Sequence, residues 1–130
     1  MNKIAVIGTG YVGLVTGTCF AETGNKVVCV DIDAAKVERM KKGEIPIYEP
    51  HLDVLFERNI KANRLTFTTD LASGIEDAEI IFLALPTPPG EDGSADLTNI
   101  KKVAEQLGKL IKSYTVIVDK TTFPIKKKKK

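Results

Sequence analysis

Apolar and polar positions along the chain follow two spacings, which alternate from one end to the other. Short continuous apolar runs, as in residues 4–7 and 80–85, are typical of strands that a parallel sheet buries on both faces. Between these runs, apolar residues recur every three or four positions, as in residues 97–112, which is typical of amphipathic helices. The strands are expected at residues 4–7, 26–31, 65–68, 79–85 and 116–118, and the helices at 14–23, 34–42, from Pro50 onward, 71–76 and 97–112. This alternation predicts one α/β domain, a doubly wound parallel sheet with helices on both faces.

Three glycines, Gly8, Gly10 and Gly13, directly follow the first apolar run. A G-x-G-x-x-G spacing is weak on its own, but here it connects a predicted strand to a predicted helix. The first glycine permits a tight turn, the second lets a pyrophosphate approach the backbone, and the third lets the helix lie close to the sheet. Amide groups of the first helical turn would then face the phosphates. The pattern indicates a Rossmann-like, dinucleotide-binding domain; a glycine-containing turn without a ligand is the alternative.

An acidic residue, Asp31, stands at the end of the second predicted strand. It follows the glycines at about the 20-residue spacing expected of a carboxylate that binds the adenosine ribose, although a solvated side chain is the alternative. A carboxylate repels the 2′-phosphate of NADP, Asp33 adds negative charge, and no Arg follows before Arg39. The sequence therefore predicts NAD as the cofactor. Lys36 either reaches back over this ribose or is a solvated lysine of the next helix.

Two irregular segments follow the later strands. Residues 86–93 contain three prolines and two glycines, and residues 120–124 come after the fifth strand. In open parallel sheets, ligands bind beyond the carboxyl ends of the strands. The hydroxyl groups of Thr87, Thr121 and Thr122 are therefore candidates to bond a nicotinamide ribose, its carboxamide or a substrate. For Thr87 an ordinary turn residue is the alternative.

Charge is unevenly distributed over the 130 residues. The net charge is +2, but residues 126–130 are five consecutive lysines. Without these five, the 19 basic residues become 14 against 17 acidic ones, so the rest of the chain carries about −3. Self-repulsion predicts a domain at residues 1–125 followed by a disordered tail, Lys126–Lys130. The lysines lack interleaved aromatic residues, so only non-specific attraction to nucleic acid or anionic lipid is expected.

The remaining composition predicts a cytoplasmic protein with no metal site. No apolar run approaches the ~18 residues that cross a membrane, and the N-terminus resembles no secretory signal. Cys19 and Cys29 are expected to be buried core thiols in a reducing compartment. His51 is the only histidine, and no ligand cluster surrounds it.

Several motifs occur in order along the chain. They are Gly8-Thr9-Gly10-Tyr11-Val12-Gly13-Leu14, Pro46-Ile47-Tyr48-Glu49-Pro50, and Pro86-Thr87-Pro88-Pro89 followed by Asp92-Gly93-Ser94-Ala95-Asp96-Leu97. Together they resemble the nucleotide-sugar dehydrogenases. The segment at residues 95–97 is most similar to the UDP-glucose 6-dehydrogenase branch, and the UDP-N-acetylmannosamine and GDP-mannose dehydrogenases are the alternatives. The resemblance covers residue 1 to about residue 124.

The resemblance implies an oxidoreductase of polysaccharide biosynthesis. Such an enzyme oxidises a sugar primary alcohol twice, through a thiohemiacetal, with two NAD⁺ per product. The resemblance implies cofactor-binding roles for Gly8, Thr9, Gly10, Tyr11, Val12, Gly13, Asp31, Lys36, Thr87 and Thr121. Thr122 matches a catalytic threonine that holds a water near the reacting sugar carbon, and Thr121 replaces a serine that contacts NAD.

The chain also departs from the pattern of this group. After Thr122 it continues as Phe123-Pro124-Ile125 and then lysines, where the group has a Val-Pro-Val-Gly-type continuation. The nucleophilic cysteine and UDP-binding domain of the group lie beyond this point, and neither Cys19 nor Cys29 matches that nucleophile.

We therefore expect a truncated, single NAD-binding domain that is inactive alone. UDP-glucose would bind only with the missing domain, and the full-length family also allows a homodimer. A non-catalytic dinucleotide-binding module is the alternative. Because the sixth strand of a full doubly wound sheet is missing, the fifth strand is expected to be an exposed edge.

Overall fold

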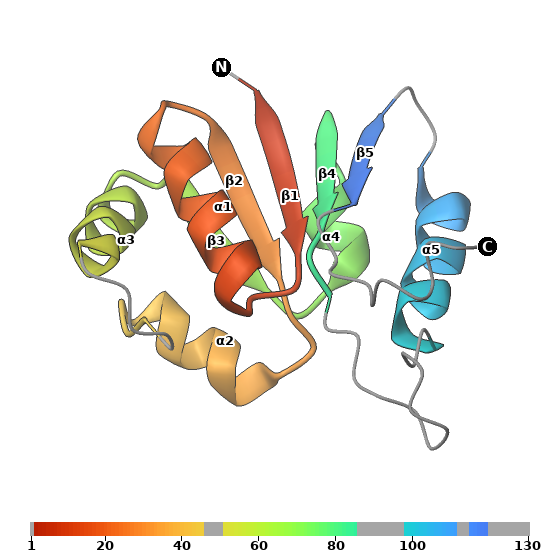
Figure 1. Ribbon diagram of the computed structural model, residues 1–130, viewed down its shortest axis with the longest axis horizontal. Coiled ribbons are helices and arrows are strands. Elements are labelled where there is room, and N and C mark those ends of the chain that lie inside the picture. Colours follow the sequence, from red (N-terminus) through yellow and green to blue (C-terminus); the bar gives the residue numbers. More distant parts are fainter. Residues whose placement is uncertain (1, 46–50, 86–97, 112–114, 120–130) are drawn as a thin grey trace, which may run out of the picture.

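The computed structural model describes residues 2–45, 51–85, 98–111 and 115–119 (Figure 1). The elements within these ranges are, in chain order, β1 (Lys3–Ile7), α1 (Tyr11–Glu22), β2 (Lys26–Val30), α2 (Ala34–Lys41), α3 (Leu52–Lys61), β3 (Leu65–Thr68), α4 (Leu71–Ile75), β4 (Ile80–Leu83), α5 (Thr98–Leu110) and β5 (Val116–Asp119). None of the helices in these ranges has both the length and the apolar character needed to cross a membrane. The predicted loop at 86–93 and the lysine run at 126–130 lie outside the described residues.

Five strands form one parallel sheet in the order β3-β2-β1-β4-β5. The chain runs outward from β1 to β3 and then crosses to the other side of β1, where β4 and β5 are added. This reversal puts the carboxyl ends of β1 and β4 at a topological switch point, where open parallel sheets bind ligands. The doubly wound, Rossmann-like fold predicted from the alternating pattern is confirmed.

Alternate residues of β1 pack on opposite faces of the sheet, because successive side chains in a strand point to opposite sides. Ile4 and Val6 belong to a core that includes buried residues of α1, α2 and α3. Ala5 and Ile7 belong to a second core, which includes buried residues of α4 and α5. Figure 1 shows the corresponding helices on the two sides of the sheet. Two-sided burial explains why this central strand is apolar at its four buried positions, residues 4–7.

Helix α1 begins at Tyr11, earlier than the predicted start at Leu14. Gly10 is its N-cap in an extended conformation, and the carbonyl of Gly10 accepts a bond of 3.0 Å from the Leu14 amide. The apolar pattern missed the first turn because Tyr11 and Val12 face outward, with 54% and 39% of their surfaces exposed. Gly13 therefore lies within the helix. The other described boundaries differ from prediction by two residues at most.

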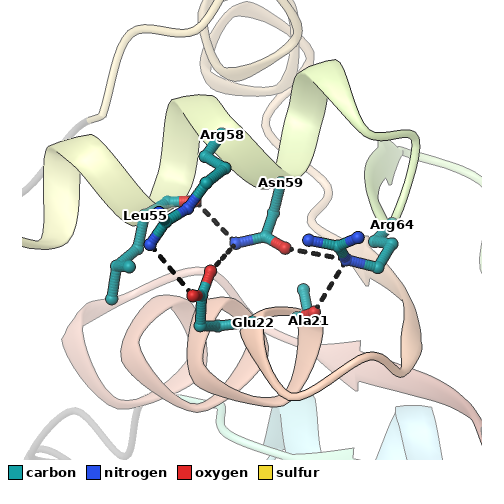
Figure 2. Close-up of polar contacts among 6 residues, drawn as sticks. All are labelled: Ala21, Glu22, Leu55, Arg58, Asn59 and Arg64. Carbon is teal, nitrogen blue, oxygen red and sulfur yellow. Dashed lines mark hydrogen bonds and ion pairs between the residues drawn. The ribbon is translucent and has the colours of Figure 1, made fainter.

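A polar network joins α3 to α1 (Figure 2). The carboxylate of Glu22 accepts bonds of 2.9 Å from the side chains of Arg58 and Asn59. The Nε of Arg64 donates to Oδ1 of Asn59 and to the carbonyl of Ala21, each at 3.0 Å. Asn59 is fully buried, so these bonds replace the water that its amide loses on folding. The network fixes α3 against the helix that carries the glycine turn.

Candidate cofactor site

The first glycine occupies a position that no other residue type fits well. Gly8 has a φ of +104°, and a Cβ added there would overlap the carbonyl of Ala84, which follows β4. The Gly8 amide donates a bond of 2.8 Å to the carbonyl of Val30 at the end of β2. The turn after β1 is therefore held between its two neighbouring strands, at the switch point of the sheet.

The second and third glycines act in different ways. A Cβ on Gly10 would meet no described atom within 4 Å, so the backbone there faces open space that a ligand can approach. A Cβ on Gly13 would overlap the carbonyl of Gly8, so this glycine lets the first turn of α1 pack against the preceding loop. The N-cap, Gly10, has no side chain of its own that could cap the helix. Such an uncapped N-terminus presents amide donors and a positive dipole end to an anion.

Asp31 lies beside this turn, immediately after β2. Its Oδ2 accepts bonds from both the amide and the hydroxyl of Thr9, the amide at 3.2 Å. Its Oδ1 accepts a bond of 2.9 Å from the amide of Asp33. These bonds anchor the carboxylate. The side chain of Asp31 is 16% exposed, so part of it is still open to a ligand.

Lys36 lies in the first turn of α2 and faces the same carboxylate. Its Nζ lies 3.8 Å from Oδ2 of Asp31. Asp33 is the N-cap of this helix, and its side chain accepts a bond of 3.1 Å from the Lys36 amide. The sequence prediction treated Asp33 only as extra negative charge; an Asp directly before a helix is the signal that would have identified the cap.

A cavity of about 1160 Å³ extends along this edge of the sheet. The predicted site residues that line it are Gly8, Thr9, Gly10, Tyr11, Val12, Asp31 and Lys36. Gly13 does not line it, because it faces the turn from behind. This volume is slightly above the ~300–1,000 Å³ of typical small-molecule sites, which suits an extended ligand such as a dinucleotide.

Sequence reasoning missed part of the cavity wall. Ile32 follows Asp31 and is 91% exposed, and Leu71 lies at the start of α4. Lys109 and Leu110 come from α5, on the opposite side. An apolar residue just after the predicted ribose-binding acid is a signal for Ile32, whereas the α5 residues face the cavity only because the fold puts that helix there. Thr87, Thr121 and Thr122 lie outside the described residues.

The two cysteines differ from each other. Cys29 is fully buried in β2, and burial, with a smaller contribution from Asp31, raises the pKa of its thiol to about 12. Such a thiol is not a nucleophile near neutral pH. The expectation that Cys19 is also buried was wrong: it lies on the exposed side of α1, whose sheet side is formed by small residues such as Gly17. Within the described ranges, no three metal-ligating side chains come together.

Comparison with known proteins identifies the group to which this site belongs. A sequence profile described as "UDP-glucose/GDP-mannose dehydrogenase family, NAD binding domain" matches residues 2–130. The chain belongs to this family. It is an NAD-binding domain of the UDP-glucose/GDP-mannose dehydrogenases, and the predicted cofactor, NAD, is confirmed by that membership.

Relatives of this family domain support the same assignment in sequence and in structure. UDP-glucose 6-dehydrogenase TuaD of Bacillus subtilis is 56% identical over 125 residues, which are 96% of this chain and 27% of the relative. A UDP-glucose 6-dehydrogenase of Pseudomonas aeruginosa is 52% identical over 123 residues, 95% of this chain and 27% of the relative. The chain thus spans about a quarter of the length of these curated relatives.

Two solved structures superpose closely on the family domain. A UDP-glucose dehydrogenase from Pyrobaculum islandicum matches with a TM-score of 0.88 and 35% identity, over 95% of this chain and 29% of that one. A GDP-mannose dehydrogenase from Pseudomonas aeruginosa, in a ternary complex, matches with a TM-score of 0.87 and 31% identity, over 92% of this chain and 28% of that one.

Proposed function

We propose that the chain serves as the cofactor domain of an enzyme that oxidises the primary alcohol of UDP-glucose to the carboxylate, giving UDP-glucuronate. The observation that carries this proposal is the anchored carboxylate of Asp31 beside an open, uncapped glycine turn. The relatives named UDP-glucose 6-dehydrogenase at 56% and 52% identity favour UDP-glucose over GDP-mannose. We also propose that residues 1–125 form the domain, that residues 126–130 are a tail outside it, and that the protein is cytoplasmic.

Different residues are proposed to bind different parts of NAD⁺. Gly8, Gly10 and Gly13 would shape the turn that receives the pyrophosphate, and amides of the first turn of α1 would donate to it. Tyr11 and Val12 would line the same turn, as would Thr9, whose amide is bonded to Asp31. Asp31 would accept bonds from the adenosine ribose, with Lys36 beside it. Thr87 and Thr121 are proposed on the nicotinamide side, and Thr122 is proposed to hold a catalytic water. The fit rests on the open space at Gly10 and on the size of the cavity.

The proposed chemistry divides between the cofactor and the protein. NAD⁺, when bound, supplies the hydride acceptor. The chain's own contribution is to orient the cofactor and to exclude a 2′-phosphate. Oxidation through a thiohemiacetal also needs an activated thiolate at the site. Cys29 is a buried thiol with a raised pKa, and Cys19 is exposed on α1 but does not line the cavity. We therefore propose that this chain by itself produces no NADH from NAD⁺ and UDP-glucose.

Calorimetric titration with NAD⁺ and NADP⁺ tests the cofactor part of the proposal. We expect NAD⁺ to bind more tightly, because the carboxylate of Asp31 accepts hydroxyl groups and repels a phosphate. Asp31→Ala should weaken NAD⁺ binding by about 10- to 100-fold, the value of hydrogen bonds to a charged group. Equal affinities of the wild-type chain for the two cofactors would contradict the proposed role of Asp31.

A chimera tests the catalytic part. Residues 1–125 of this chain replace the aligned segment of the Bacillus subtilis relative, with which they share 56% identity. The folded chimera should produce NADH from NAD⁺ and UDP-glucose, and Asp31→Ala in it should lower that activity. If the chimera folds but is inactive while the unmodified Bacillus subtilis enzyme is active, the proposed role of this chain in UDP-glucose oxidation is contradicted.

A further inference from the structure

We propose that Thr9 is a positioning residue whose hydroxyl holds the carboxylate of Asp31 in its ribose-binding orientation. The proposal rests on the proposed NAD⁺ site and assigns a role to the side chain between the first two glycines. The G-x-G-x-x-G pattern itself leaves that side chain undefined.

The side chain of Thr9 is turned away from solvent. The residue is 1% exposed, although it belongs to the turn that lines the cavity. Its hydroxyl donates to Oδ2 of Asp31, and its amide donates to the same oxygen at 3.2 Å. Most buried hydroxyls in proteins are hydrogen-bonded, and here the partner is Asp31, the residue predicted to bind the ribose. The side chain of Thr9 therefore acts on a ligand through Asp31.

The two oxygens of Asp31 have different surroundings. A carboxylate offers about four acceptor sites, two on each oxygen. Both donors of Thr9 point to Oδ2, and the ammonium of Lys36 lies 3.8 Å from that oxygen. Oδ1 receives only the amide of Asp33, at 2.9 Å, among the described donors that the structure assigns to it. The free acceptor capacity for ribose hydroxyls is thus mainly on Oδ1.

This division makes the carboxylate rigid before a ligand arrives. A side chain that is already fixed in its binding rotamer loses less entropy on binding, so affinity rises without a new contact. Replacement of the hydroxyl by a methyl group would leave Oδ2 with one donor from Thr9 in place of two, so the carboxylate would be held less firmly in this orientation. Replacement of Thr9 by serine keeps the hydroxyl donor, whereas replacement by valine keeps the shape of the side chain and removes the donor.

The test measures NAD⁺ binding by amide chemical-shift titration, which also reports whether each variant is folded. The variants are Thr9→Val, Thr9→Ser and Thr9→Ala, each made in the wild-type chain and in Asp31→Ala. In the wild-type chain, Thr9→Val and Thr9→Ala should raise the Kd for NAD⁺ by about 3- to 10-fold, the value of one hydrogen bond. Thr9→Ser should stay within about 2-fold, because it keeps the hydroxyl donor.

A double-mutant cycle separates positioning from packing. In Asp31→Ala, the change of Thr9 should have no further effect on the Kd, because the group it positions is gone. A loss of the same size in both backgrounds would overturn the proposal. Thr18→Val is the matched control, because Thr18 is a buried threonine of α1 that does not line the cavity. Its hydroxyl has no partner in the described part of the chain, so NAD⁺ binding should not change.

The outcomes distinguish this proposal from the proposed function. If the wild-type chain fails to bind NAD⁺, the proposed function fails. If it binds NAD⁺ and Asp31→Ala weakens binding, while Thr9→Val and Thr9→Ala bind as well as the wild type, the function stands and the role of Thr9 is refuted.

Discussion

At the scale of single residues, the charge next to Asp31 bears on the choice between NAD⁺ and NADP⁺. The ammonium of Lys36 lies 3.8 Å from Oδ2 of Asp31, and the two side chains are 24% and 16% exposed. A partly exposed pair between this ammonium and the 2′-phosphate of NADP⁺ would contribute up to ~1 kcal/mol. Replacement of Lys36 by Met should therefore lower NADP⁺ affinity by about 3- to 5-fold and NAD⁺ affinity by about 2-fold at most.

Competition titrations with both cofactors measure these two affinities. Lys41→Met is the matched control, because Lys41 is on the same helix and its ion pair with Glu38 is exposed. An equal loss of NAD⁺ and NADP⁺ affinity in Lys36→Met would mean that Lys36 contacts a group common to both cofactors.

The two thiols should react differently with a thiol reagent. Cys19 is exposed, whereas Cys29 is completely buried and its pKa is raised to about 12. At pH 8 the folded chain should therefore release one equivalent of thionitrobenzoate from Ellman's reagent quickly, and the unfolded chain should release two. Cys19→Ser should remove the fast equivalent. Rapid reaction of both thiols in the folded chain would contradict the burial of β2.

Some residues of the site could be predicted from the sequence, and others could not. Asp31 and the glycines were found because their spacing is fixed within one strand–turn–helix–strand unit. The contact between Thr9 and Asp31 was not predicted, since it depends on how the turn after β1 meets the end of β2. The same holds for Lys109, which reaches the cavity from a helix far along the chain.

At the scale of elements, α3 should depend on a single buried amide. Asn59 donates to Glu22 at 2.9 Å and accepts from Arg64 at 3.0 Å. Asn59→Ala should reduce the free energy of unfolding by about 1–3 kcal/mol, because it leaves buried partners without their bonds. Glu57→Gln on the same helix alters only an exposed pair with Lys61, so it should cost about 0.5 kcal/mol or less.

Urea unfolding of the three chains measures these differences. A loss in Asn59→Ala no larger than that of Glu57→Gln would mean that apolar packing alone holds α3. The sequence predicted this helix from its apolar stripe, but not the network, because the partners on α1 and α3 are separated by 37 positions along the chain.

At the scale of the whole molecule, the alternation of strand and helix patterns was sufficient to predict the sheet. Once the strands are parallel and the crossovers right-handed, few arrangements remain, and the observed order is one of them. The size of the cavity was not predictable in this way. It depends on the distance at which α5 packs from the glycine turn, which is set by many side-chain contacts across the second core.

The expected edge of the sheet leads to a prediction about association. In the described part of the chain, β5 pairs only with β4, and it is drawn in blue beside that strand in Figure 1. Val116 and Ile117 on this strand are 40% and 47% exposed. An apolar edge with unpaired backbone groups can pair with another chain, and lysine on such an edge opposes pairing.

Sedimentation of the chain over a range of concentrations should therefore show an average mass that rises with concentration. Ile117→Lys should reduce this rise. Val54→Lys is the control, because Val54 is 60% exposed on α3 and belongs to no sheet edge, so the same charge added there should leave association unchanged. If both lysine variants reduce association equally, net charge is the cause, since β5 is then no more important than any other exposed apolar site.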